Sequence, residues 1–271
     1  MTDSNPYIRS LLAADPLREP TLRAIIQALN LPMSSRGLDV GCGIGLQALL
    51  LAQSIGPQGH VTGLDIDLEL LAYGAGLAKN VGLTGRITFR QGDMQQLPFD
   101  AATFDWVWSA DCVGYPIGDL AQQLPELVRV TKPGGQIILL AWTSQQVLPG
   151  YPLLEAQLNA TCSSYQPYLK GKDPELHFLR AARWFEAAGL QRVTARTFLG
   201  EVQAPLSAGE RGALTALFKM LWVEPSNSAD SAAWSEYQRV CTPESPDFIL
   251  NVPGYYAFFT YTVFHGQVPQ R

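Results

Sequence analysis

The sequence predicts an α/β fold built around a mostly parallel sheet. Hydrophobic residues make up 47% of the 271 residues and charged residues only 16%, so the chain has ample material for a packed core. Apolar or β-branched segments alternate with helical patterns over residues 36–142, and a glycine-rich turn joins the first strand to its helix. Strands that alternate with helices form parallel sheets wound with right-handed crossovers.

The alternating part can be divided into elements in chain order. A helix is expected over 16–30, with Asp15 as its N-cap and Pro16 in its first turn. Lys132-Pro133-Gly134-Gly135 is expected to form a turn. The predicted strands are 37–40, 61–65, 87–90, 104–109 and 136–142, and the helices between them are 46–55, 68–81 and 118–130.

The C-terminal part continues the same pattern with two interruptions. A helix over 179–188, closed by Gly189, precedes strands over 192–198 and 255–265, and a further helix is expected near 208–222. Long segments outside the core of an α/β domain are usually functional covers. We therefore expect a single domain, 1–271. Its core is about 36–142, 179–200 and 255–266, and its insertions of about 143–178 and 201–254 form a substrate cover.

Composition excludes several classes of protein. The net charge of −5 argues against a nucleic-acid partner, which needs a dense Lys/Arg stripe. The sequence contains no C-x-x-C pair, no metal-ligand cluster, no basic and apolar leader, and no apolar run long enough for a membrane span. We expect a cytoplasmic monomer or homodimer without metal, whose thiols are reduced. The four thiols are Cys42, Cys112, Cys162 and Cys241.

The glycine-rich turn and a later acid predict a nucleoside site. Asp39-x-Gly41-x-Gly43-x-Gly45 lies between a strand and a helix, where glycines permit a tight turn and close approach of a ligand. Asp65 ends the next strand, about 20 residues further on, where a carboxylate can accept hydrogen bonds from both ribose hydroxyls. Because it faces a crevice at a strand end, we expect Asp65 to need no partner in the core of the fold. The ligand is then a dinucleotide or S-adenosylmethionine.

The spacing of the glycines separates these two ligands. A dinucleotide fingerprint, G-x-G-x-x-G/A, needs a third small residue. Counting from Gly41 places Leu46 there, and counting from Gly43 places Ala48 there only in a shifted frame. The pattern D-x-G-x-G-x-G instead resembles motif I of class I S-adenosylmethionine-dependent methyltransferases.

Three further segments resemble that family in the same order. They are Val61–Ile66 (its ribose-binding motif), Gln91–Phe99 (its third motif) and Arg129–Gly135 (the turn before strand five). The chain thus resembles the subgroup of ubiquinone/menaquinone-biosynthesis and sterol methyltransferases. The resemblance implies a Rossmann-like, seven-stranded sheet with the last strand antiparallel and helices on both faces. It also implies methyl transfer from S-adenosylmethionine to a small-molecule acceptor by in-line displacement without metal.

The resemblance also implies where the cofactor binds. In the family, the acid at the position of Asp93 accepts a bond from the adenine amino group, and the next residue, Met94, packs on the ring. Tyr7 is expected to fold over the cofactor as a lid. The complete expected set is Tyr7, Asp39, Gly41, Cys42, Gly43, Asp65, Ile66, Gly92, Asp93, Met94, Ser109 and Ala110.

The catalytic assignment leaves more open. Asp111 follows strand four and is the candidate general base or substrate anchor, and Tyr115 is a candidate pocket residue. The three histidines are expected to be structural or at the surface. The acceptor atom is oxygen, nitrogen or carbon. Two alternatives remain: an NAD(P)-dependent oxidoreductase, or a non-catalytic nucleoside-binding protein on the same fold.

Overall fold

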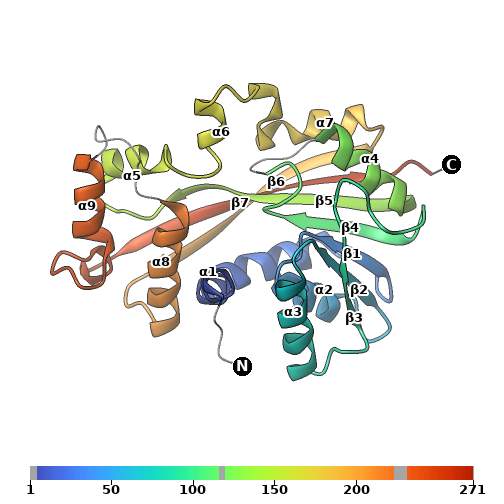
Figure 1. The fold of residues 1–271 in the computed structure, drawn as a ribbon, viewed down its shortest axis with the longest axis horizontal. Helices are drawn as coiled ribbons and strands as arrows, with labels where there is room; N and C mark the ends of the chain where they lie inside the picture. Colours follow the sequence, from blue (N-terminus) through green and yellow to red (C-terminus); the bar gives the residue numbers. More distant parts are fainter. Residues whose placement is uncertain (1–4, 116–119, 223–230, 271) are drawn as a thin grey trace. The chain divides into compact units, whose positions relative to one another are not determined.

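A computed structural model describes residues 5–115, 120–222 and 231–270. Its strands form one seven-stranded sheet in the order β3-β2-β1-β4-β5-β7-β6 (Figure 1). Six strands are parallel and the last, β7, is antiparallel, which confirms the Rossmann-like fold class. The strands are β1 Arg36–Val40, β2 His60–Asp65, β3 Ile87–Gln91, β4 Phe104–Ala110, β5 Thr131–Gln146, β6 Gln191–Gln203 and β7 Tyr256–Gln267.

The chain divides into two compact units. Unit 1 comprises Met1–Thr21, Thr143–Asp173 and Leu199–Tyr261, and unit 2 comprises Leu22–Trp142, Pro174–Phe198 and Thr262–Arg271. The expectation of one domain stays a prediction. The α-helices are α1 Pro6–Leu29, α2 Leu46–Ser54, α3 Leu68–Asn80, α4 Leu120–Val130, α5 Pro152–Asn159, α6 Gln166–Leu169, α7 Ala181–Ala187, α8 Ala208–Leu221 and α9 Ser231–Cys241.

Helices cover both faces of the sheet within unit 2. One face carries an apolar core in which strand residues such as Leu38 and Val107 pack with Leu127 of α4 and Phe185 of α7. On the other face Trp108 donates from Nε1 to Gln47 of α2, at 2.8 Å. Trp106 and Trp108 are fully buried. Because side chains alternate along a strand, successive residues at a strand end point to opposite faces of the sheet.

The predicted start of the first helix was wrong. The first helix, α1, begins at Pro6 rather than at residue 16, so Asp15 and Pro16 lie inside it. Asn5 starts this helix, because its Oδ1 accepts hydrogen bonds from the amides of Tyr7 (2.9 Å) and Ile8 (3.5 Å). Residues 118 and 119, where the fourth helix was expected to start, lie outside the described residues.

The expected Lys132–Gly135 turn is instead part of β5. The register jumps from Phe104↔Thr131 to Trp106↔Gln136, so the glycine-rich segment forms a bulge opposite one residue of β4. Gly134 has a φ of +78°, which a bulge residue adopts readily only as glycine. Its amide donates to the carbonyl of Val268, at 2.9 Å. The glycines therefore serve to bend a strand.

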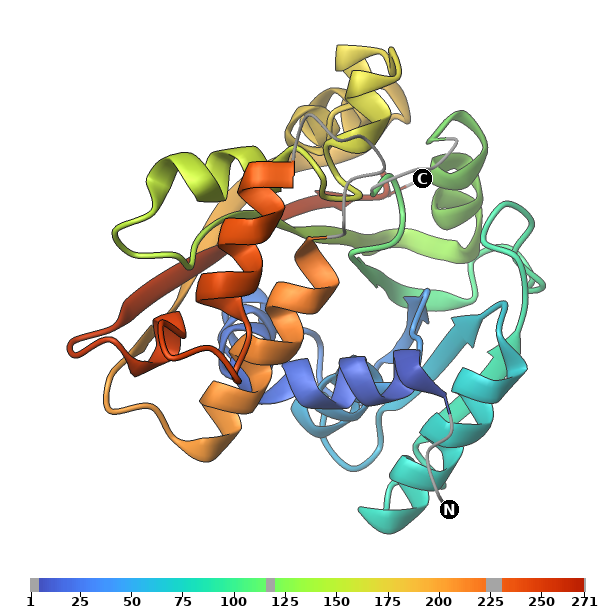
Figure 2. The ribbon, with the colours of Figure 1, turned by 60° about the vertical axis from the view of Figure 1, so that its left-hand side comes forward.

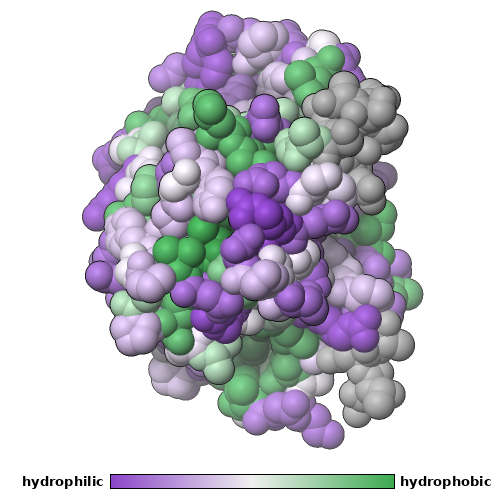
Figure 3. All heavy atoms as spheres, turned by 90° about the vertical axis from the view of Figure 1, so that its left-hand side faces the viewer, coloured by the Kyte–Doolittle hydropathy of each residue, from purple (hydrophilic) through white to green (hydrophobic). Residues whose placement is uncertain are grey.

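Unit 1 contains most of the residues expected to form the cover. α5 packs against α9 (Figure 2). Glu155 of α5 is buried and accepts hydrogen bonds from the amides of Val147 (2.8 Å) and Leu148 (3.0 Å), which fixes the end of β5. The face drawn in Figure 3 carries apolar side chains in several patches between polar ones. One exposed apolar residue of unit 1 is Leu153 of α5, at 80% exposure.

Candidate functional site

The glycine loop has a conformation that requires its glycines. Gly41, Gly43 and Gly45 all have positive φ, at 73°, 54° and 75°. A Cβ at Gly41 would lie 2.2 Å from Sγ of Cys112. The amides of Gly41 and Cys42 both donate to the carbonyl of Leu64, at 2.8 and 3.0 Å, so the loop is tied to the end of β2.

Asp65 holds the glycine loop and the start of α3 together. Its Oδ2 accepts from the amide of Gly43 (2.8 Å) and its Oδ1 from the amide of Asp67 (3.0 Å). The expectation that Asp65 has no partner within the fold was therefore wrong, because the carboxylate organises the turn in which it lies. A carboxylate oxygen has two acceptor positions, so each oxygen of Asp65 retains one for a ligand hydroxyl.

Asp39 lies in the same layer and is almost completely buried. Its side chain is 2% exposed, and its Oδ2 has no hydrogen-bond partner. Burial, followed by the negative charge of Asp65, raises the pKa of Asp39 to about 8. Burial, with smaller effects of both carboxylates, also raises the pKa of the Cys42 thiol. The end of β1 therefore carries a neutral carboxyl group at pH 7.

The second and third motifs lie next to each other. The amide of Gly92 donates to the carbonyl of Asp65, at 3.0 Å. Asp93 is exposed, and its Oδ1 accepts from the amide of Gln95 (2.8 Å), so the residue forms a tight turn. Ile66 follows Asp65 and is 68% exposed. Met94 is half-buried.

The loop after β4 is strained at one residue. Asp111 has a φ of +51°, and its Oδ1 accepts from the amide of Trp142 at the end of β5, at 2.7 Å. Left-handed backbone at a residue other than glycine is uncommon and is typical of functional sites. Tyr115 lies further along this loop, with its ring 6.2 Å from that of Phe178. Ser109 and Ala110 are buried, and the Ser109 hydroxyl donates to the carbonyl of Val40 (2.9 Å).

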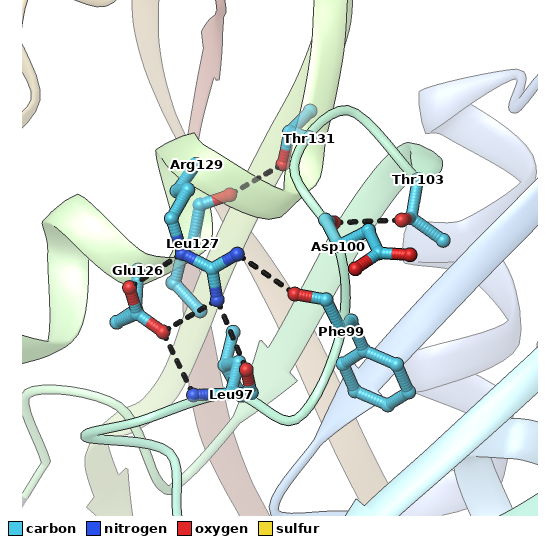
Figure 4. A network of polar contacts seen from close by, with 8 residues as sticks. All are labelled: Leu97, Phe99, Asp100, Thr103, Glu126, Leu127, Arg129 and Thr131. Atoms are coloured by element: carbon cyan, nitrogen blue, oxygen red, sulfur yellow. Dashed lines mark hydrogen bonds and ion pairs between the residues drawn. The ribbon is translucent and has the colours of Figure 1, made fainter.

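Arg129, near the end of α4, holds the third motif, Gln91–Phe99, in place (Figure 4). Its guanidinium donates to the carbonyls of Leu97 (2.9 Å) and Phe99 (2.7 Å) and to both carboxylate oxygens of Glu126 (2.7 Å each). Glu126 also accepts from the amide of Leu97, at 2.8 Å. The hydrogen bond from Arg129 is the main cause of the lowered pKa of Glu126. The Arg129–Gly135 segment thus joins α4 to the third motif.

Gln123 was missed by sequence reasoning. It is 3% exposed; its Oε1 accepts from the amide of Gly114 (3.2 Å) and its Nε2 donates to Sδ of Met94 (3.3 Å). It therefore links the third motif to the loop that carries Asp111. A polar residue beside the apolar positions of an amphipathic helix was the available signal.

The structure also describes the surroundings of Tyr7 and of the three histidines. Tyr7 belongs to unit 1 and is 56% exposed, and its role as a lid stays a prediction. His177 accepts from the amide of Leu179 (3.3 Å) and caps a short 3₁₀ helix. His60 hydrogen-bonds Thr88 at 3.0 Å, and burial lowers the pKa of His265.

The described residues contain neither a metal-ligand cluster nor a membrane-spanning helix. No group of three or more His, Cys, Asp or Glu side chains there comes together in a way that could hold a metal ion. No helix among those described is both long and apolar enough to cross a membrane. The expectation of metal-independent chemistry stays a prediction.

The residues at the strand ends fit a nucleoside that carries a positive charge. Asp65 has free acceptor positions for vicinal hydroxyls, and exposed Ile66 beside it offers an apolar surface for a base. Asp39 supplies a buried carboxyl oxygen without a partner. The Gly41–Gly45 loop exposes backbone where a ligand can approach closely. This combination matches S-adenosylmethionine better than a dinucleotide, whose pyrophosphate is negatively charged.

Comparisons with known proteins agree with this site. Residues 38–135 match the family described as methyltransferase domain. A demethylmenaquinone methyltransferase of Bacillus cytotoxicus is 31% identical over 202 residues, which cover 69% of this chain and 81% of that enzyme. The enzyme of the same name from Lysinibacillus sphaericus is 32% identical over 185 residues, covering 63% and 76%.

Solved structures show the same fold. The YcgJ protein of Bacillus subtilis matches with a TM-score of 0.55 at 19% identity, covering 93% of this chain and all (100%) of that one. An S-adenosylmethionine-dependent methyltransferase of Aquifex aeolicus matches with a TM-score of 0.54 at 17% identity, covering 96% and 97%.

The fold and the strand-end site define a methyltransferase that uses S-adenosylmethionine. More narrowly, the chain belongs to the class I S-adenosylmethionine-dependent methyltransferases of the menaquinone and ubiquinone type. It transfers a methyl group from S-adenosylmethionine to a small-molecule acceptor. Nothing in the comparisons favours an oxidoreductase or a non-catalytic protein.

Proposed function

We propose that the acceptor is the ring of a reduced quinone, methylated at carbon. The observation that carries this proposal is the similarity to demethylmenaquinone methyltransferases, of which the chain covers 81% and 76% in two examples. The aligned part covers 69% of this chain, so the acceptor is proposed as a class, an aromatic diol with an apolar substituent. Exposed apolar side chains such as Leu153 are consistent with an apolar acceptor.

The residues given above for the cofactor are part of this proposal. Asp65 binds the ribose hydroxyls, Asp93 accepts from the adenine amino group, and Ile66 and Met94 flank the base. The loop residues Asp39, Gly41, Cys42 and Gly43 surround the methionine part, with Ser109 and Ala110 forming the buried floor at the end of β4. Tyr7 closes over the cofactor.

Asp111 is proposed to act on the acceptor. Methyl transfer from the bound sulfonium to a ring carbon forms one carbon–carbon bond, breaks one carbon–sulfur bond and leaves one proton to remove. A carboxylate that takes the phenolic proton makes the ring more nucleophilic and contributes about 10²- to 10⁴-fold. The backbone of Asp111 is held by Leu140 (2.9 Å) and its side chain by Trp142 (2.7 Å), which supports a fixed orientation. Tyr115 is proposed to line the acceptor pocket.

We also propose a substrate cover, an oligomeric state and a cellular location for the enzyme. The segments of about 143–178 and 201–254 cover the acceptor side, and the protein is a cytoplasmic monomer or homodimer without a nucleic-acid partner. The cytoplasmic location is supported by four free cysteines, which are typical of reducing compartments. The net charge of −5 supports the absence of a nucleic-acid partner.

A purified assay tests the acceptor and Asp111 together. The wild-type protein is incubated with S-adenosylmethionine and either a short-chain demethylmenaquinol or the oxidised quinone, with chelator present, and methylated product is measured by mass spectrometry. We expect carbon methylation of the reduced ring only, and a kcat lower by about 10²- to 10⁴-fold in Asp111→Asn. Methylation of the oxidised ring, or full activity of Asp111→Asn, would contradict the assignment. Loss of activity with chelator and recovery with magnesium would contradict a metal-free reaction.

A further inference from the structure

Asp39 is a buried carboxyl group with one oxygen that has no hydrogen-bond partner. It is 2% exposed, and the unpartnered oxygen is Oδ2. Buried polar atoms are nearly always paired in native proteins, so an exception in a binding site needs an explanation. The methyl-transfer step proposed above makes no use of this residue.

The position of Asp39 in the sheet places it beside Asp65. Asp39 is aligned with Gly63 of β2, and Asp65 is two residues further along the same strand. Residues two apart project from the same face, so both carboxyl groups belong to one layer of unit 2. Gly63 has no side chain to separate them. α2, which covers this face, contains no ionisable residue in its sequence Leu46–Ser54.

The titratable groups that interact with this pair of carboxyl groups are acids or thiols, whereas Arg86 donates to the carbonyls of Ala52 and Gly56 at the C-terminal end of α2. Cys42 is influenced by Asp39, Asp65 and Cys112, while Cys112 is influenced by the same two acids and by Asp111. Burial raises the pKa of Cys112 to about 12, so this thiol is neutral. The charge that acts on Asp39 is that of Asp65, and together with burial it keeps Asp39 protonated at pH 7. A protonated acid is how a protein tolerates a buried carboxyl group without a counter-charge.

S-Adenosylmethionine carries a positively charged sulfonium, and its product does not; the proposed binding of its methionine part at the Asp39–Gly43 loop brings that charge near Asp39. The two ligands differ by one methyl group and by the charge of the sulfonium. A nearby positive charge favours the ionised carboxylate, and a neutral thioether does not. We propose that Asp39 is a specificity-determining residue that releases its proton to solvent when S-adenosylmethionine binds and keeps it when S-adenosylhomocysteine binds. Asp39 thereby favours binding of the methyl donor and release of the product.

Proton counting by calorimetry tests this directly. Both ligands are titrated into the wild-type protein at pH 7 in buffers of different ionisation enthalpy, and proton exchange by the free ligands' own amino groups is subtracted. We expect S-adenosylmethionine to release about 0.5–1 proton more than S-adenosylhomocysteine. By linkage, the affinity ratio in favour of S-adenosylmethionine then rises about three- to tenfold per pH unit near pH 7. An equal number of protons for the two ligands would overturn the proposal.

Asp39→Asn provides the matched comparison, because the amide resembles the protonated acid in shape. We expect this variant to lose the difference in proton release and to bind S-adenosylmethionine about tenfold or more weakly, while S-adenosylhomocysteine binds as in the wild type. Asp67→Asn is the control, since Asp67 is exposed and caps α3, and asparagine caps equally well. An Asp39→Asn protein that keeps the wild-type difference in proton release between the two ligands would contradict the proposal. If Asp39→Asn does not fold, the wild-type difference between ligands decides alone.

Discussion

Three acids at the strand ends differ in what surrounds them. Asp39 is buried with its Oδ2 unpartnered, Asp65 accepts hydrogen bonds from two backbone amides, and Asp111, in a left-handed backbone conformation, accepts one from the end of β5. From these environments we propose a separate role for each: Asp39 distinguishes the charged methyl donor from its neutral product, Asp65 binds the ribose, and Asp111 acts as the base. The sequence motif alone does not separate the roles, because burial and hydrogen bonding set the behaviour of a carboxyl group.

Replacing Asp65 with asparagine should weaken cofactor binding and also destabilise the fold. The amide removes the charge and one acceptor, and charge-assisted bonds are worth about 1.5–3 kcal/mol each. We expect affinity for S-adenosylhomocysteine to fall by about 10- to 150-fold. Since Asp65 accepts from Gly43 and Asp67, the melting temperature should fall as well. Calorimetry and thermal denaturation measure the two effects, and unchanged affinity in a folded variant would remove the ribose role.

Asp39→Asn should stabilise the ligand-free protein increasingly as pH rises. The pKa of Asp39 is raised from 3.8 to about 8, so above pH 3.8 the unfolded chain is ionised while the folded protein keeps its proton. The wild type therefore loses stability from pH 4 toward pH 8, by up to about 1.4 kcal/mol per unit. We expect the melting temperature of the variant relative to wild type to rise by about 2–6 °C between pH 6 and pH 8. A difference that does not change with pH would show that Asp39 is ionised in the folded protein.

At the scale of elements, α4 contacts both the third motif, Gln91–Phe99, and the loop after β4 that carries Asp111. Gln123 near its start contacts Gly114 and Met94, and Arg129 at its end holds Leu97 and Phe99. The sequence predicts this helix and the motifs on either side of it. It does not predict which polar side chains hold them together, because such contacts depend on the depth to which each side chain is buried.

Gln123→Leu tests that connection. The change leaves the buried amide of Gly114 without its acceptor, at a cost of about 1–3 kcal/mol, and releases Met94 from its polar contact. We expect a lower melting temperature and a several-fold weaker affinity for S-adenosylhomocysteine. Gln157→Leu, at an exposed position of α5 in unit 1, is the control and should leave both quantities unchanged. A Gln123→Leu protein that melts lower but binds as tightly as wild type would limit Gln123 to a structural role.

At the scale of the whole molecule, the parallel core was the most predictable part. Strands and helices over 36–142 have strong periodicity and glycine signals, and their boundaries are within one or two residues in most cases. The start of α1 was mispredicted because Pro16 and Pro20 look like helix boundaries, whereas Asn5 caps the helix earlier. The sequence of the Lys132–Gly135 bulge resembles that of a turn, because glycine is common in both structures.

The acceptor that we propose for the methyl group of S-adenosylmethionine is the ring of a reduced quinone. The most direct measurement uses S-adenosylmethionine carrying an isotopically labelled methyl group, incubated with the purified protein and a complete metabolite extract kept under reducing conditions. We expect the label in one apolar aromatic diol, bonded to a ring carbon, and a much lower yield with Asp111→Asn. Label on an oxygen or nitrogen atom, or in the protein or nucleic-acid fraction, would contradict the account.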